Sequence, residues 1–282
     1  MSMSDDQLKE SVGRWFKDAL NTHGHVFQNA LVKAIAGIRS QAGWTPWIPE
    51  FPVEVQGTHT RIDFVLINKR SDMYLVCECK RSNPALSNWC FAKSSFKPNN
   101  SLFNRSYMET LQYIGEGQIR AHVKELLPSD RIYQVAVEVK SAQKGDASSP
   151  GRGQIEEAAT QVCRQLNGLM ECFHKRKKIM DGRAHVSFLP VLFTTAKLWT
   201  TDLDLSTADL ESGELELDTI PVKDVSWLWY QYHQSPGLKH SVPAANISTQ
   251  LMDILFYEFV KPIAVVTPAG LEEFLCSQTW GY

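Results

Sequence analysis

The sequence predicts an α/β fold, in which helices flank a mixed central β-sheet. Apolar residues recur at helical spacing over 4–24, 26–43 and 154–176. Runs rich in β-branched and aromatic residues lie between these helices. Two of the runs, 58–67 and 73–80, are close enough in the chain to form an antiparallel hairpin. Helices that alternate with a hairpin and single strands are typical of a mixed sheet with helices on its faces.

Two helices and a strand precede the hairpin. The first helix, over 4–24, has acidic residues early, and the second, over 26–43, ends at a glycine. The stretch 47–56 contains Pro49 and Pro52 and then alternates between apolar and polar residues. We therefore expect a strand there that is entered late.

The segment after the hairpin combines irregular, helical and extended patterns. Residues 82–98 are predicted to be irregular, and residues 101–127 to be largely helical with weak points at Gly115 and Gly117. Residues 131–142 carry few charges, so we expect a strand that joins the sheet in parallel, beside the hairpin.

The last third of the chain mixes strands with an acidic segment. A buried strand is predicted over 184–196, followed by a turn-rich acidic stretch over 200–218. Strands near 226–233 and 263–268 and a short helix over 269–275 complete the prediction.

The composition is that of an ordinary globular protein. The chain has 282 residues, of which 43% are hydrophobic and 21% charged, and this excludes disorder, collagen and coiled coil. No linker is long enough to force a domain boundary. We predict a single domain over 1–282, with a core at about 20–200 and a C-terminal extension at about 201–282.

Charge and cysteine content bound the setting of the protein. The formal net charge is −2, so attraction to nucleic acid would have to come from local patches. None of the six cysteines lies in a CxxC pair, which suggests free thiols and a reducing compartment. The N-terminus lacks the apolar core of a signal peptide, and no apolar stretch is long enough for a membrane span. We expect a soluble, cytoplasmic protein without membrane contact.

Three ionic residues interrupt the two apolar runs of the hairpin. If the turn centres between residues 70 and 71, Asp63 faces Glu78, with Cβ atoms roughly 4.5–5.5 Å apart. Two carboxylates at that distance repel each other in an apolar setting. Lys80 points to the same face as Glu78 but cannot neutralise both acids. A divalent cation can, and oxygen-only ligands favour Mg²⁺ or Mn²⁺.

The arrangement of Asp63, a short link and "ECK" at 78–80 resembles the PD-(D/E)XK nuclease superfamily, over roughly residues 26–168. The resemblance implies a restriction-endonuclease-like core in which Asp63 and Glu78 bind Mg²⁺. It makes Lys80 the catalytic lysine that orients or activates the attacking water. The implied activity is metal-dependent phosphodiester hydrolysis, by a DNA endonuclease of bacterial restriction or antiphage defence. Double-stranded DNA is the expected partner, with a homodimer or a defence-system protein as further partners.

The corner of the site that the family often fills with an acid from the first helix holds Gln28 here. An amide oxygen can coordinate a metal or hold a bound water, but it brings no charge. Glu50 and Glu54, on the preceding strand, are alternatives. Gln161, on the helix over 154–176, is the expected glutamine near the site, and Gln165 shares its helix face.

A second ExK stands at Glu138-Val139-Lys140, but no acid can be placed opposite Glu138. We therefore prefer the first ExK, while Lys140 remains a candidate phosphate contact. The stretch 80–105 is basic and aromatic, which is plausible for nucleic-acid contact, although its aromatics could equally be core residues. The candidate cations in this stretch are Arg81, Lys93, Lys97 and Arg105.

The second function to consider is a catalytically inactive module with the nuclease fold, which binds nucleic acid or a protein partner. An amide at position 28 in place of an acid favours this alternative. The presence of Asp63, Glu78 and Lys80 together favours the enzyme.

Overall fold

The computed structural model describes most of the chain. Its described residues are 5–22, 24–68, 71–83, 86–94, 106–114, 118–126, 129–139, 153–176, 184–244 and 257–278.

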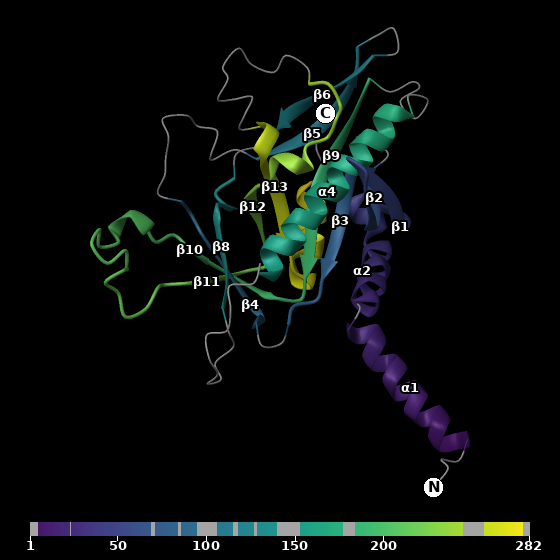
Figure 1. Cartoon of the computed structure of the whole chain (residues 1–282), viewed down its shortest axis with the longest axis horizontal. Coiled ribbons are helices and arrows are strands. Elements are labelled where there is room, and N and C mark those ends of the chain that lie inside the picture. Colours follow the sequence, from purple (N-terminus) through teal and green to yellow (C-terminus); the bar gives the residue numbers. More distant parts are fainter. Residues whose placement is uncertain are drawn as a thin grey trace.

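Within these residues, nine strands form one mixed sheet (Figure 1). Its main path runs through β1 (Thr45–Val55), β2 (Thr58–Asn68), β3 (Met73–Lys80), β9 (His185–Thr194), β13 (Val260–Val266), β12 (Trp227–His233) and β7 (Ile132–Tyr133). Off this path, β5 and β6 (Tyr107–Tyr113, Ile119–Glu125) pair with each other, and β5 pairs with β9. β1, β2 and β3 are antiparallel, whereas β3, β9 and β13 are parallel. The predicted α/β class with a mixed central sheet is confirmed, and the C-terminal strands β12 and β13 belong to that sheet.

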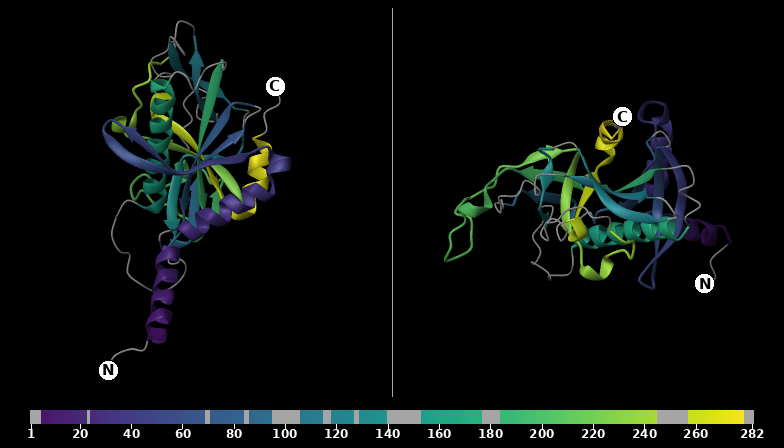
Figure 2. Two further views of the ribbon diagram at one scale, coloured as in Figure 1. Left: turned by 90° about the vertical axis from the view of Figure 1, so that its right-hand side faces the viewer. Right: turned by 90° about the horizontal axis from the view of Figure 1, so that it is seen from above.

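Helices cover both faces of the main sheet (Figure 2). α4 (Gln154–Lys175) packs on one face with a large apolar cluster. α2 (His25–Gly37), α3 (Arg39–Ala42) and α6 (Leu271–Ser277) lie on the other. The indole Nε1 of Trp44 donates to the carbonyl of Leu275 at 3.0 Å, which joins the N- and C-terminal segments on that face. The remaining short helices are 3-10 turns at Leu205–Thr207, Pro236–Leu238 and Pro268–Gly270.

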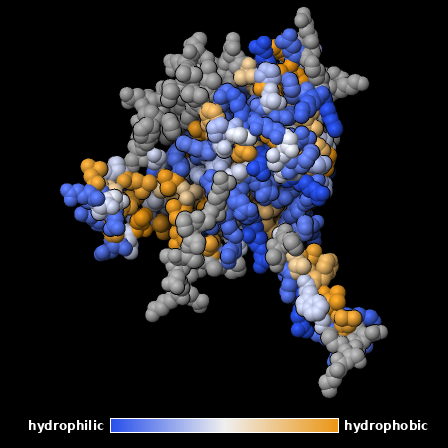
Figure 3. Space-filling view, in the orientation of Figure 1, coloured by the Kyte–Doolittle hydropathy of each residue, from blue (hydrophilic) through white to orange (hydrophobic). Residues whose placement is uncertain are grey.

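α1 (Asp5–Thr22) projects away from the body of the protein (Figure 1). Its apolar side chains at Leu8, Val12, Trp15 and Phe16 are exposed to between 49% and 63% (Figure 3). Of the helices that the structure describes, none combines the length and apolar character needed to cross a bilayer.

A second, smaller sheet stands beside the first. Its order within the described residues is β11 (Lys223–Val225), β10 (Lys197–Thr201), β4 (Asn88–Ala92) and β8 (Val135–Val139). The prediction that residues 82–98 are irregular is therefore wrong for β4. The side chains of Trp89 and Phe91 are fully buried in the cluster that α4 covers. They are therefore core residues and are not exposed for stacking on nucleic-acid bases.

Two further predictions are corrected by strand pairing. The predicted helix over 101–127 is wrong, because β5 and β6 form a hairpin and β5 adds to the edge of β9. The predicted strand over 131–142 divides into β7, which pairs with β12, and β8, which pairs with β4. The strand beside β3 is β9, which follows α4. The pairings of β5 with β9, β7 with β12, β8 with β4 and β3 with β9 join residues far apart in the chain. Local periodicity therefore does not reveal them.

The contact between α4 and β1 depends on a glycine. A Cβ added at Gly168 would lie 2.8 Å from the Cβ of Val53, a buried residue of β1. We expect Gly168→Ala to lower the free energy of unfolding by about 1–3 kcal/mol, because the packed strand cannot yield freely. Urea unfolding measures this loss.

Gly13→Ala is the matched control. Gly13 lies within the exposed helix α1, where an added Cβ meets nothing within 4 Å. This substitution should raise the stability of α1 by up to about 1 kcal/mol. An equal effect of both substitutions would contradict the close contact at Gly168.

Candidate active site

The hairpin has the register that the sequence predicts. The pairs run from Asn68–Met73 to Phe64–Cys77, and Asp63 and Glu78 are the next residues on the two strands. The Oδ2 atom of Asp63 accepts a hydrogen bond from the backbone N–H of Cys79 at 2.7 Å. The end of the hairpin therefore brings the two carboxylates together.

Glu78 is a buried acid with a specific hydrogen-bond partner. Its residue exposure is 3%, and its Oε2 atom accepts from Nε2 of Gln165 on α4 at 2.6 Å. Burial, reinforced by the charge of Asp63, raises the pKa of Glu78 to about 8, against the lowering effects of Gln165 and Lys80. The carboxyl therefore takes up a proton unless another positive charge compensates it.

Asp63 shows a smaller shift of the same kind. Burial raises its pKa to about 6, the hydrogen bond from the Cys79 N–H lowers it, and the charge of Glu50 raises it further. Burial and the charge of a neighbouring acid therefore raise the pKa of both carboxyls.

Gln28 and Glu50 form the adjoining corner of the site. The Nε2 atom of Gln28 donates to the carbonyl of Asp63 at 2.6 Å and to Oε1 of Glu50 at 3.2 Å. Glu50 stands across from Asp63 on β1, because the flanking pairs are Pro49–Phe64 and Phe51–Ile62. Its backbone has φ 51°, in the left-handed region that non-glycine residues rarely adopt. The structure thus places the acid of this corner on β1 and uses Gln28 to position it.

Lys80 extends from the same strand face as Glu78. Its Nζ atom lies 3.3 Å from Oε1 of Glu157, in the first turn of α4. The side chain of Lys80 is 21% exposed and that of Glu157 61% exposed. A pair so open to solvent contributes little net stability, so Lys80 is free to exchange partners.

The glutamine that α4 directs at the site is Gln165, and this replaces the prediction of Gln161. Besides Glu78, the Nε2 atom of Gln165 also donates to the carbonyl of Arg61 at 2.8 Å. Gln161 lies one turn nearer the N-terminus of α4 and is only half-buried. The helical spacing of the two residues indicates the correct face but not which turn meets β3.

The donor chemistry fits a hard cation. Within the described ranges, no three His, Cys, Asp or Glu side chains stand together in an arrangement that could hold a metal ion. Asp63 and Glu78 nevertheless supply two carboxylates whose repulsion a cation would cancel. The Oε1 atom of Gln165 is buried and has no hydrogen-bond partner in the described part of the chain. These three side chains offer oxygen ligands, as Mg²⁺ and Mn²⁺ prefer.

The second ExK has a structural role. Oε1 of Glu138 accepts the backbone N–H of Ile155 at 2.7 Å, and Glu138 pairs with Trp89 within the second sheet. This bond satisfies one of the free N–H groups at the start of α4. Glu138 therefore caps the helix that carries Gln165. Lys140 lies outside the described residues.

Two of the proposed nucleic-acid contacts have partners within the protein. Lys93 pairs with Asp202 at 3.0 Å and lies over the ring of Tyr133. Arg81 is exposed, and its Nη1 atom donates to the carbonyl of Asn21 at 2.6 Å. Lys97 and Arg105, like Lys140, lie outside the described residues, so no position is given for them.

Comparison with known proteins yields no relative. The chain matches no protein-family model, no curated protein and no solved structure. The interpretation of the site therefore rests on its own residues and geometry.

The raised pKa of Glu78 predicts a pH-dependent stability. The pKa of Glu78 rises from 4.5 to about 8 on folding, so the folded state binds the Glu78 proton more tightly than the unfolded state does. The stability that this proton contributes is complete below pH 4.5 and is lost as the pH rises through 8. Without metal, the wild-type free energy of unfolding should therefore fall between pH 5 and pH 8.5, with Glu78 contributing on the order of a few kcal/mol. The free energy of unfolding of Glu78→Gln, whose amide oxygen can still accept from Gln165, should fall less over the same pH range.

Urea unfolding at the two pH values checks this prediction, with Glu272→Gln, an exposed acid of α6, as the control. Added Mg²⁺ at pH 8.5 should stabilise the wild type and leave Glu78→Gln nearly unchanged. If the free energy of unfolding changes with pH equally in wild type and Glu78→Gln, the raised pKa of buried Glu78 is contradicted.

The capping role of Glu138 gives a further prediction. Glu138→Ala should lower the free energy of unfolding by about 1 kcal/mol, because the N–H of Ile155 loses its acceptor. Glu138→Gln keeps an acceptor oxygen and should lose less. Thermal unfolding of both variants measures the difference, and a larger loss for the glutamine variant would argue against the cap.

Proposed function

We propose that the chain is a metal-dependent nuclease of PD-(D/E)XK type, which hydrolyses phosphodiester bonds. The observation that carries the proposal is the pair of carboxylates at the end of one hairpin, buried Glu78 and half-buried Asp63, with Lys80 on the same strand face as Glu78. A buried acid pair of this kind stabilises neither the hairpin nor the sheet by itself. A bound cation and chemistry at phosphorus would account for such a pair beside a lysine.

The order of the elements supports a restriction-endonuclease-like core. α2, the antiparallel strands β1, β2 and β3, then α4 and the parallel strand β9 follow one another, with the acids on β2 and β3. The residues between β3 and α4 hold the inserted strands β4 to β8. This layout is compatible with the family that Asp63 and the ExK at 78–80 resemble.

Each residue of the site has a distinct task in this proposal. Asp63 and Glu78 would hold the cation, and Gln165 fixes the orientation of the Glu78 carboxylate through its Nε2 hydrogen bond. Gln28 holds Glu50 and the backbone of Asp63 in place. A bound Mg²⁺ would supply polarisation of the phosphoryl oxygen and a lowered pKa of a coordinated water.

Lys80 would act on the attacking water and offset charge that develops on the phosphate. In the free protein it pairs with Glu157, which lies in solvent at the start of α4. A substrate phosphate offers a more negative partner at the same place, so Lys80 would leave Glu157 when the substrate binds. Duplex DNA is the substrate we propose first, within a bacterial restriction or antiphage system, where two cuts in a duplex would suit a homodimer.

A nuclease fold that binds without cutting is the second candidate. The observation in its favour is that the described residues place no third acid with Asp63 and Glu78 in a ready-made metal cluster. In that case Lys80 would stay with Glu157, and nucleic acid would bind without being cleaved.

The decisive experiment incubates plasmid, linear DNA and RNA with the protein and Mg²⁺ or Mn²⁺. Lys80→Ala should reduce the cleavage rate by about 10²–10⁴-fold, because it removes the group that acts on the water. Asp63→Asn should abolish metal-dependent cleavage. Lys197→Ala, a half-exposed lysine of the second sheet that pairs with Asp224, is the control and should cut at the wild-type rate.

The outcomes separate the two candidates. Cleavage of equal rate in Lys80→Ala and wild type would overturn the site. Loss of cleavage in Glu138→Gln with full activity in Glu78→Gln would move it to the second ExK. Binding without cleavage, by wild type and variants alike, would favour the non-catalytic module.

A further inference from the structure

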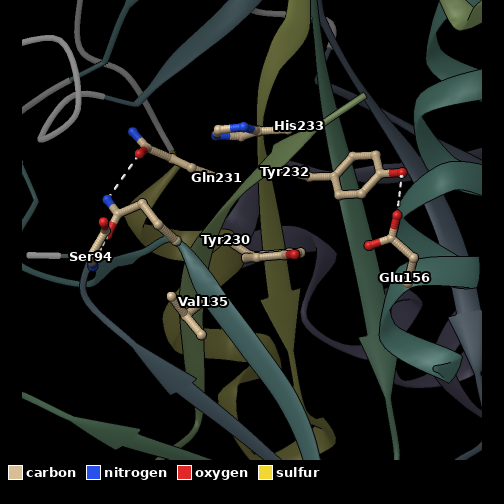
Figure 4. Close-up of a pocket in the computed structure, with 8 residues that line it drawn as sticks. Ser94, Val135, Glu156, Tyr230, Gln231, Tyr232 and His233 are labelled. Carbon is tan, nitrogen blue, oxygen red and sulfur yellow. Dashed lines mark hydrogen bonds between the residues drawn. The ribbon is translucent and has the colours of Figure 1, made fainter. Parts of the chain in front are cut away.

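A pocket of about 420 Å³ lies at the C-terminal end of β12, next to the first turn of α4 (Figure 4). The link between β7 and β8 closes its other side. Its lining residues are Ser94, Gln134, Val135, Glu156, Tyr230, Gln231, Tyr232 and His233. Its size falls within the range of small-molecule sites, roughly 300–1,000 Å³.

One wall of the pocket is aromatic and carries an acid. Tyr230 and Tyr232 extend from β12 toward α4, where Glu156 stands (Figure 4). The hydroxyl of Tyr232 donates to Oε1 of Glu156 at 3.0 Å and lies 2.7 Å from Oγ1 of Thr160. Both tyrosines are at least nine-tenths buried, whereas Glu156 is exposed. The acid is therefore held in place by a buried phenol but faces the opening.

The opposite wall is a chain of amides. The backbone N–H of Ser94 donates to Oε1 of Gln134 at 2.9 Å, and Nε2 of Gln134 donates to Oε1 of Gln231 at 2.9 Å. Gln231 is 1% exposed. These bonds fix the orientation of both amides, so the pocket has a defined pattern of donors and acceptors. Within the described residues, the pairing of β12 with β7 ends at Tyr230–Tyr133.

The charge of the pocket decides the class of ligand. Among the residues that the structure describes, the lining contains no lysine or arginine, and Glu156 adjoins Glu157, a second acid. A phosphate would be repelled there. The pocket suits a neutral, flat group that presents hydrogen-bond donors to a carboxylate and rests among aromatic and amide side chains.

The pocket shares the first turn of α4 with the candidate active site. Glu156 faces the pocket, and the next residue, Glu157, pairs with Lys80. The pocket and Lys80 are thus linked through two consecutive residues of one helical turn.

We propose that this pocket binds an unpaired guanine base of the nucleic acid, read by Glu156. Guanine offers N1–H and the 2-amino group side by side, and a carboxylate has two acceptor oxygens to match them. Adenine and cytosine each present a ring acceptor beside the amino group, which the carboxylate opposes. The inference rests on the proposed function for its nucleic-acid ligand and adds a base preference to it.

The test measures binding of single nucleosides to the full chain without added metal, by NMR line broadening or calorimetry. Guanosine should bind more tightly than inosine, which lacks the 2-amino group, and than adenosine or cytidine. Glu156→Gln should weaken guanosine binding by about tenfold or more, since it loses a charge-assisted hydrogen bond. Tyr232→Phe, which keeps the ring but frees the carboxylate, should weaken it by a smaller factor, and Glu272→Gln should have no effect.

The result does not depend on cleavage, because nucleosides contain no phosphodiester bond. Glu156-dependent guanosine binding in a protein that cuts no nucleic acid would support the pocket while the nuclease function fails. No saturable guanosine binding, equal binding of all four nucleosides, or unchanged binding in Glu156→Gln would overturn the proposal.

Discussion

The burial of Glu78 beside Asp63 is the constraint around which the central part of the molecule is arranged. Two acids in an apolar setting need hydrogen-bond donors: the N–H of Cys79 on β3 donates to Asp63, and Gln165 on α4 donates to Glu78. Gln28 on α2 donates to the backbone carbonyl of Asp63 and so fixes the strand beside the acid. Both helices that face the hairpin therefore contribute a glutamine to one point. The pKa of each acid stays raised, so these donors do not cancel the cost of burial, and in the proposed function a cation would complete the balance.

The hairpin could be predicted from sequence because its determinants are local. A short polar link and two apolar runs leave few registers, and the one in which Asp63 and Glu78 follow the last pair is the one observed. The fold class follows from the helix at 154–176 and the runs around it. By contrast, β5 pairs with β9, more than seventy residues later in the chain, as the pairing of Thr110 with Ser187 shows, and β6 joins the sheet through β5. No local pattern carries that information.

The two ExK sequences show why a motif is interpreted through its surroundings. Glu78 and Glu138 stand at the same spacing from a lysine, but only Glu78 has an acid next to it across the strand pair. Glu138 accepts the backbone N–H of Ile155 at the start of α4, so it has a capping partner there. Similarly, Gln161 and Gln165 share a helix face, and only the distance between α4 and β3 decides which of them reaches Glu78.

α4 carries Glu156, Glu157 and Gln165 along one continuous helix, and its N-terminus is held by Glu138. Each residue of an α-helix adds a rotation of about 100°. A single-residue insertion between Glu157 and Gln165 would therefore rotate Gln165 by that angle relative to the two acids. The amide would leave Glu78 while the acids kept their places. Insertions and deletions in α4 should therefore be far less tolerated than substitutions on its exposed side, and the length of this helix, more than its composition, is what a lineage of this protein has to preserve.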